Sequence, residues 1–200
     1  MPITAKENSK PRELIPQGVH DAICYLVVDI GTQVTNFGDK RKIIIGWEFS
    51  DIRMKMEDGT DMPKVKSTTL TLSLHEKSAL RPLLEGWRNR KFTAQELSEG
   101  FDISRLLGVN CQIQILHETK DSGVTYDNIA NVIPPKSGQI AKVKTENDHV
   151  YFSLEDGNPI PEGVYDWIKD KIKSSVEWGT DKEPEYVTDG PDVDEDDCPF

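Results

Sequence analysis

Apolar and polar residues alternate along the first half of the chain in a way that predicts three strands. Residues 19–30 (VHDAICYLVVDI) and 40–49 (KRKIIIGWEF) are rich in β-branched side chains, as strands commonly are. In residues 64–75 (KVKSTTLTLSLH) leucine recurs at every second position between threonine and serine, which is the period of a half-buried strand. The glycines and polar residues between these segments predict turns.

The period changes to that of a helix in residues 76–92. Apolar residues recur there at the i, i+3, i+4 and i+7 spacing of one helical face, namely Leu80, Leu83, Leu84 and Trp87. Residues 93–108 predict one or two further short helices that end at Gly108. Alternation resumes in residues 109–119 and 125–135, which predict a fourth and a fifth strand.

Three strands, a helical insertion and two more strands thus follow one another along the chain. This order matches the OB-fold, a five-stranded Greek-key barrel with a helix between strands three and four. We predict a mainly β protein with an OB-fold domain over residues 16–135, preceded by a flexible arm over residues 1–15. A mixed α+β sandwich would give a similar order of elements and is the alternative fold.

The last third of the chain has a different composition. Residues 136–179 predict an extension that holds one more short pair of strands and then an amphipathic helix over 163–179. The apolar face of that helix repeats every fourth residue, at Val164, Ile168, Ile172 and Val176. Residues 180–200 have few apolar side chains and many acids, a composition that predicts a disordered acidic tail.

The acidic balance of the protein comes mainly from this tail. The chain has a net charge of −11, which by itself argues against binding to nucleic acid. Residues 174–200, however, carry ten acids and one lysine, a net charge of −9, which leaves −2 for residues 1–173. A basic surface on the nearly neutral body is therefore compatible with the composition.

Residue types with reactive or metal-binding side chains form no recognisable site. Cys24 and Cys111 lie in predicted strands, where we expect small buried side chains, and the three cysteines include no CxxC pair. The four histidines are scattered, and no phosphate-binding, hydrolase, zinc-protease or dinucleotide motif occurs. We therefore expect no enzyme, no cofactor and no metal. Since no apolar run could span a bilayer and no leader is evident, we expect no membrane partner and a cytoplasmic location.

Cations and aromatic residues cluster on the predicted strands, and this combination indicates a surface for single-stranded nucleic acid. Such surfaces use cations to follow the phosphates and rings on which bases stack. The six candidates for phosphate contacts are Lys40, Arg41, Lys42, Arg53, Lys64 and Lys66. The four candidates for stacking are Tyr25, Trp47, Phe49 and Tyr126.

Each of these residues also has a structural interpretation. Trp47 and Phe49 share the parity of Ile43 and Ile45, so they could equally fill the core. Tyr25 shares its face with two aspartates, which favours exposure. The lysines could be ordinary solvated charges, so the prediction depends on the whole cluster.

The chain ends in Asp194, Glu195, Asp196, Asp197, Cys198, Pro199 and Phe200. An acidic tail can raise solubility or compete with DNA, but neither role requires a terminal aromatic ring. A ring with its own carboxylate can fill an apolar pocket rimmed by basic residues, while the acids add electrostatic attraction. We therefore predict that this tip binds partner proteins.

The final five residues resemble the acidic tip of bacterial single-stranded DNA-binding proteins, which typically ends Asp-Asp-x-Pro-Phe. Cys198 stands where that tip usually has an aliphatic residue. The body resembles OB-fold single-stranded DNA-binding proteins of tailed bacteriophages, chiefly in IPQGVHDAICYLVVDIGTQVTNFGDKRKIIIGWEFSD (15–51) and VYDWIKDKIKSSVEW (164–178).

This resemblance implies a protein of phage DNA replication, recombination or repair in the cytoplasm of an infected bacterium. It would bind single-stranded DNA and recruit a polymerase, helicase, primase or recombinase through its tip. Two other functions stay open, an OB-fold adaptor of the replication machinery without DNA affinity and a metal-dependent nuclease. Monomer and dimer are both compatible with the sequence.

Overall fold

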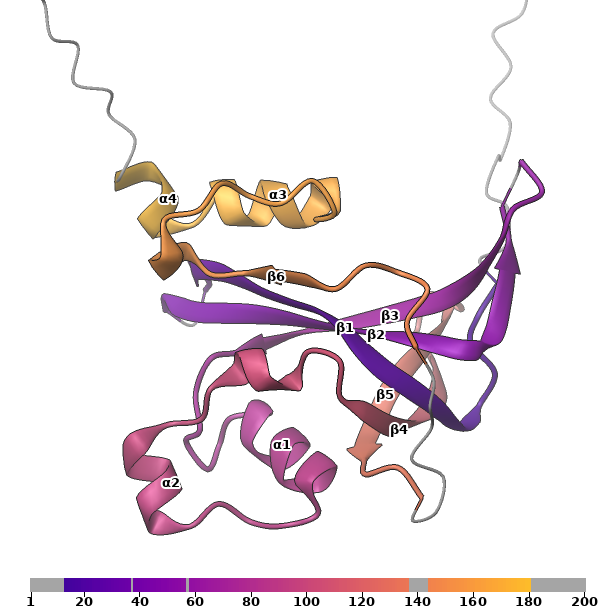
Figure 1. Cartoon of the computed structure of the whole chain (residues 1–200), viewed down its shortest axis with the longest axis horizontal. Helices are drawn as coiled ribbons and strands as arrows, with labels where there is room; N and C mark the ends of the chain where they lie inside the picture. Colours follow the sequence, from indigo (N-terminus) through magenta and orange to yellow (C-terminus); the bar gives the residue numbers. More distant parts are fainter. Residues whose placement is uncertain (1–12, 37, 57, 137–143, 181–200) are drawn as a thin grey trace, which may run out of the picture.

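The protein contains one six-stranded sheet with short helices on both sides (Figure 1). The computed structural model describes residues 13–36, 38–56, 58–136 and 144–180. The strands are β1 (Gly18–Gln33), β2 (Lys40–Lys55), β3 (Asp61–Thr71), β4 (Asn110–Thr119), β5 (Thr125–Ile133) and β6 (Val150–Phe152). The helices are α1 (Leu80–Arg88), α2 (Ala94–Glu99), α3 (Asp166–Lys173) and α4 (Val176–Thr180), with 3-10 turns η1 (Ile103–Leu106) and η2 (Leu154–Asp156).

Strand β1 is the centre of the sheet, whose order is β3-β2-β1-β4-β5. All neighbours in this order are antiparallel, and β6 pairs in parallel with residues 26–28 of β1. The first part of β1 pairs with β4, and the register with β2 is interrupted twice by bulges. Bulges bend a strand and increase its twist. The predicted mainly β fold, with five strands and helices between the third and fourth, is confirmed at this level.

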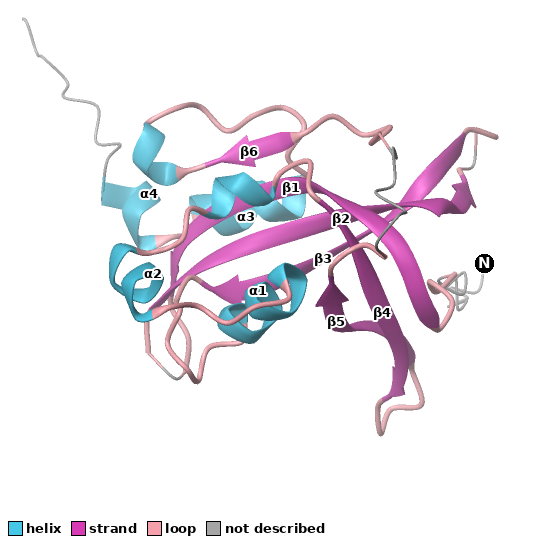
Figure 2. Ribbon diagram, turned by 60° about the horizontal axis from the view of Figure 1, so that its bottom comes forward, coloured by secondary structure: helices cyan, strands magenta, loops and turns pink. Residues whose placement is uncertain are grey.

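The sheet is not closed into a hydrogen-bonded barrel. Among the described residues β3 and β5 share no ladder, and Figure 2 shows the β2–β3 and β4–β5 hairpins projecting in different directions. Side chains connect the two strands instead. The Nζ atom of Lys66 on β3 donates to Asp127 on β5, with 2.6 Å to Oδ1. The other Asp127 carboxylate oxygen, Oδ2, accepts from the backbone N–H of Ile15 at 3.1 Å.

One face of the sheet, here called the inner face, packs against the helical insertion. Ile43, Ile45, Trp47 and Phe49 project from β2 into this core. The rings of Trp47 and Trp87 lie 5.9 Å apart between centroids, and Trp87 donates its indole N–H to the Asn110 carbonyl. Figure 1 shows α1 and α2 on this side of the sheet. The predicted helical face of α1 is therefore buried as expected, except that Leu83 is only partly buried.

The opposite, outer face is covered by α3 and α4, while β6 lies beside β1 and adds side chains to this face (Figure 1). Leu26, Val28, Ile30 and Ile44 of the sheet form a second core with residues of the extension. Ile168 and Ile172 of α3 are both 0% exposed there. Since these side chains are as buried as those of the inner core, the extension is an integral layer of the fold. The end of the predicted flexible arm is also fixed, because Ile15 is buried in the inner core.

The predicted single helix over 163–179 is divided into α3 and α4. Ser175 lies between them, and its hydroxyl donates to the Ile172 carbonyl. As a result Val176 does not continue the apolar face and is 46% exposed, which corrects the prediction for this residue. The predicted pair of strands before the helix is a single strand in the described residues, β6. No helix in the described part of the chain is long and apolar enough to cross a membrane.

Candidate nucleic-acid interface

Two of the four predicted stacking rings belong to the core. Trp47 and Phe49 are both 0% exposed and face the helical insertion. Both rings lie on the same face of β2 as Ile43 and Ile45 because they pack in the core, and not because they bind bases. A base could not reach either ring without unfolding β2, so we exclude both residues from the candidate interface.

Tyr25 is also buried, with 4% of its surface exposed, so its predicted outward exposure is wrong. Its ring packs in the outer core between β1 and α3. Its hydroxyl donates to the hydroxyl of Tyr165 at 3.3 Å. Burial, with the nearby Tyr165 hydroxyl, raises the pKa of Tyr25, which keeps the phenol protonated at neutral pH.

Arg41 is engaged by two carboxylates instead of being free for a phosphate. Its guanidinium lies 2.6 Å from an oxygen of Asp29 and 2.6 Å from an oxygen of Glu155. These contacts, with Asp29 first, raise the pKa of Arg41, and the charge is locally neutralised.

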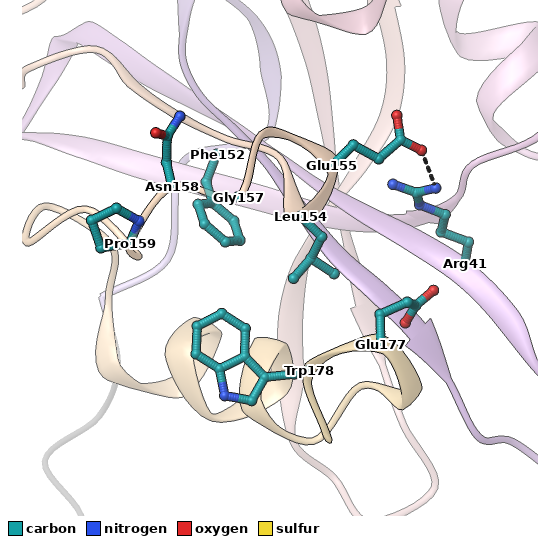
Figure 3. Close-up of a pocket in the computed structure, with 9 residues that line it drawn as sticks. All are labelled: Arg41, Phe152, Leu154, Glu155, Gly157, Asn158, Pro159, Glu177 and Trp178. Carbon is teal, nitrogen blue, oxygen red and sulfur yellow. Dashed lines mark hydrogen bonds and ion pairs between the residues drawn. The ribbon is translucent and has the colours of Figure 1, made fainter. Parts of the chain in front are cut away.

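Arg41 lines a cavity of about 660 Å³ that Figure 3 shows between the β6–α3 connection and α4. Phe152, Leu154 and Trp178 form its apolar wall. Glu155 and Glu177 also line it, so its charged groups do not favour an anionic ligand.

Arg53 is likewise paired. It donates to Asp61 at 3.0 Å across the β2–β3 hairpin and to Glu146 in the extension. The hydrogen bond to Glu146 is the main reason that the pKa of Arg53 is raised. Since its side chain is 33% exposed, this pairing is weak, and Arg53 could exchange a carboxylate for a phosphate.

Lys64 and Lys66 stabilise the closure of the inner core. Lys64 is 6% exposed and donates to the carbonyl oxygens of Glu13 and Leu14. Lys66 reaches Asp127, which is 2% exposed, and thereby connects β3 to β5. Both ammonium groups replace hydration with internal acceptors, as buried charges require. Neither is a free phosphate ligand in this structure.

Lys40 and Lys42 are the predicted cations that remain available. They begin β2 at the β1–β2 hairpin, where Lys40 is exposed and Lys42 half-buried. Within the described residues neither side chain takes part in an ion pair. Their positions suit contacts with phosphates, which need solvent-accessible ammonium groups.

The first turn of α4, the last described helix, lies beside this hairpin. Glu177 of α4 accepts hydrogen bonds from the N–H of Thr32 at 2.7 Å and from its hydroxyl at 2.5 Å. Thr32 faces Arg41 in the β1–β2 register, and Gln33 faces Lys40. Residue 180 is thus held on the same side of the molecule as the cations at the start of β2.

Tyr126 is the one predicted ring that is exposed, at 36% of its surface. It lies at the start of β5, and the Nζ atom of Lys120 lies 4.8 Å from its ring centroid. A cation beside an exposed ring is the combination that a stacked base and its phosphate require.

Two more exposed rings, Tyr165 and Trp167, were not selected from the sequence. They lie at the start of α3 and are 42% and 47% exposed. The pattern contained a signal for them, because both fall outside the apolar repeat of Val164, Ile168 and Ile172. Aromatic residues on the polar side of an amphipathic helix require an explanation other than core packing.

The predicted partner-binding tip, from Asp194 to Phe200, lies outside the described residues, as do most of the arm (1–12) and the tail (181–200). Within the described ranges no group of three or more histidine, cysteine or acidic side chains could hold a metal ion. Cys24 and Cys111 are buried, as predicted, and burial raises the pKa of the Cys24 thiol to about 12.

Comparison with known proteins adds no assignment. No protein-family model matches the chain, and a search of curated proteins finds no significant match.

Proposed function

We propose that this protein binds single-stranded DNA with little dependence on base sequence and acts in phage DNA replication, recombination or repair. In this proposal it has no enzymatic activity. Its acidic tip, Asp194 to Phe200, recruits partner proteins and competes with DNA for the basic surface.

The observation that carries the proposal is the order β3-β2-β1-β4-β5 with the helical insertion between β3 and β4. This is the arrangement expected of an OB-fold, whose barrel is partly open and commonly binds oligonucleotides. The contact between Lys66 and Asp127 would take the place of a β3–β5 ladder at the opening.

The predicted residues that are accessible to solvent support a smaller DNA-binding surface than the sequence predicted. Lys40 and Lys42 would contact phosphates at the β1–β2 hairpin, and Tyr126 with Lys120 would hold a base at the β4–β5 hairpin. The contact of Glu177 in the first turn of α4 with Thr32 of the β1–β2 hairpin supports competition by the tail, because the acids of residues 181–200 follow within a few residues of that contact.

An OB-fold adaptor without DNA affinity is the second candidate, and one observation favours it. Arg41, Arg53, Lys64 and Lys66 are all engaged in ion pairs inside the protein. A surface that has lost these four cations would bind phosphates less strongly. The adaptor would use its tip, or the outer surface of the fold, to contact proteins.

Deletion of Asp194–Phe200 tests both parts of the proposal. We expect the truncated protein to bind oligo-dT more tightly than the full chain, because a competing anionic segment is lost. It should no longer capture purified host replication proteins. Unchanged DNA affinity together with retained partners would contradict the role of the tip.

Phe200→Ala is the matched control for this deletion, because it removes the ring and keeps every acid. We expect this variant to bind DNA like the full chain and to lose its partners. Incubation of a labelled strand with Mg²⁺ should leave the strand intact. Magnesium-dependent cleavage would instead support the nuclease alternative.

A further inference from the structure

A groove lies between the edge strand β3 and the start of α3, at the border of the outer face. It has a volume of about 440 Å³, and its lining includes Tyr25, Val65, Ser67, Tyr165 and Trp167. This volume is within the range of small-molecule binding sites. The groove is separate from the hairpins that carry Lys40 and Tyr126.

Two of the rings that line the groove are open to solvent. Tyr165 is 42% exposed and Trp167 is 47% exposed, whereas Ile168 beside them is 0% exposed. Tryptophan is highly buried on average, so an indole with this exposure beside a groove marks a contact surface. Tyr165 precedes the first residue of α3 and has an extended backbone, which allows both rings to line the same groove.

The floor of the groove holds one of these rings in position. The buried phenol of Tyr25 donates to the Tyr165 hydroxyl at 3.3 Å. Tyr25 is fixed in the sheet by the outer core, so this contact restricts the orientation of the Tyr165 ring. A ring that is oriented in advance loses less conformational entropy when a ligand stacks on it.

Cations lie close to the exposed rings. Lys169 is one helical turn from Tyr165 and pairs with Asp166 at 3.2 Å. Because the Asp166 side chain is 95% exposed, that pair is solvated and contributes little energy. The last turn of α3 adds Lys171 and Lys173. Exposed rings with a weakly paired ammonium group one helical turn away suit a ligand that combines planar apolar groups with negative charge.

We propose that this groove stacks one or two bases of a single-stranded nucleic acid, with Trp167 and Tyr165 as the stacking rings and Tyr25 as a positioning residue. Lys169 contacts the adjoining phosphate. The inference rests on the proposed function. It assigns base contacts to the C-terminal extension, because the predicted rings Trp47 and Phe49 on β2 are buried. An aromatic segment of a protein partner is the competing occupant.

Substitution of Trp167 by alanine tests the assignment through oligo-dT affinity measured by fluorescence anisotropy. Stacking contributes about 1–3 kcal/mol per base, so we expect Trp167→Ala to weaken binding by about 5- to 150-fold. Trp167→Phe should retain most of the affinity, because a ring remains. Tyr151→Ala is the matched control, since Tyr151 on β6 is 41% exposed and does not line this groove.

The outcomes separate the two proposals. If the full chain binds oligo-dT and Trp167→Ala binds equally well, the groove assignment is overturned and the proposed function stands. If the full chain does not bind oligo-dT at low salt, both are overturned. If only partner capture is weakened by Trp167→Ala, the groove binds protein and the assignment to bases is again overturned.

Photo-crosslinking gives a result that does not depend on a variant. An oligonucleotide that contains 5-iodouracil should crosslink to the full chain within the peptide that carries Tyr165 and Trp167. Crosslinks confined to other peptides would overturn the inference, even if Trp167→Ala failed to fold.

Discussion

The two faces of the sheet are both buried, but they are covered and closed in different ways. The inner face lies under the helical insertion and is rich in rings, with Trp47 against Trp87. The outer face lies under α3 and α4, and its core is mainly aliphatic. Trp47, Phe49 and Trp87 are buried in the inner core, whereas Tyr165 and Trp167 of the extension lie at the border of the outer face and reach solvent.

On both sides of the sheet, carboxylates join segments that are distant in the sequence. Asp127 joins β3, β5 and the N-terminal segment on the inner side through Lys66 and Ile15. On the outer side Glu48 is 0% exposed and accepts from the backbone N–H groups of Glu146 and Asn147, each at 2.9 Å. Glu177 in the first turn of α4 binds Thr32 in a similar way. Because the extension is fixed by these contacts as well as by burial, a binding surface on it can be as rigid as one on the sheet.

The largest effect is expected from Asp127→Ala, which removes the carboxylate that pairs with Lys66 on the inner side and accepts from the Ile15 N–H. Lys66 would keep its charge with only the backbone carbonyl of residue 127 as an acceptor, and the loss of one partner of a buried ion pair costs about 3–5 kcal/mol of unfolding free energy. Urea unfolding followed by tryptophan fluorescence measures the change. Asp121→Ala in the exposed β4–β5 turn is the control and should unfold like the parent protein. A loss for Asp127→Ala as small as that of the control would show that Asp127 does not close the inner face.

A matched pair of substitutions compares the two cores directly. Ile45 on the inner face and Ile168 on the outer face are both 0% exposed, so alanine should create a cavity at either site. We expect each variant to lose about 2–5 kcal/mol of unfolding free energy in the same urea experiment. If Ile45→Ala fell in this range and Ile168→Ala lost less than about 0.5 kcal/mol, as surface substitutions do, the extension would not be a layer of the fold.

The fold was largely predictable from the sequence because its strands and helices have clear periods. Alternation located the strands, and the change of period located α1. The division between α3 and α4 was missed, because the repeat continues through Val176 although the helix does not. The extent of the cover over the outer face also depends on contacts between distant segments, such as those of Glu48 with Glu146 and Asn147.

A smaller effect, dependent on pH, is expected from Glu177→Gln in the first turn of α4. Burial opposes ionisation of Glu177, but the hydrogen bonds from Thr32 outweigh it and lower the pKa below the ordinary 4.5. A carboxyl with a lowered pKa stabilises the fold above its unfolded-state pKa, and this stability is lost as the pH falls through the folded-state value.

The parent should therefore be more stable than Glu177→Gln at pH 7, by about 1 kcal/mol. The difference should diminish as the pH is lowered below about 4.5, in thermal unfolding curves recorded at several pH values. A difference that stays constant down to the most acidic pH would show that ionised Glu177 is not the source of the stability.

The candidate site was predicted less well than the fold, for two physical reasons. Residues 43–49 of β2 are buried on both faces, so parity alone could not separate a core ring from an exposed one. The partners of the cations come from distant segments, as when Asp127 binds Lys66 across 61 residues of sequence. The sequence therefore showed where the cations are but not which of them form ion pairs inside the protein.

The salt dependence of oligo-dT binding tests the central claim most directly. For the full chain we predict measurable affinity at low salt and a linear fall of log K with log salt concentration, since phosphates release counterions when they are bound. Lys40→Ala and Lys42→Ala should each reduce the slope by about 0.7, the share of one phosphate contact on a single strand. Absence of binding at low salt, or affinity that does not change with salt, would contradict the proposal that this protein binds single-stranded DNA.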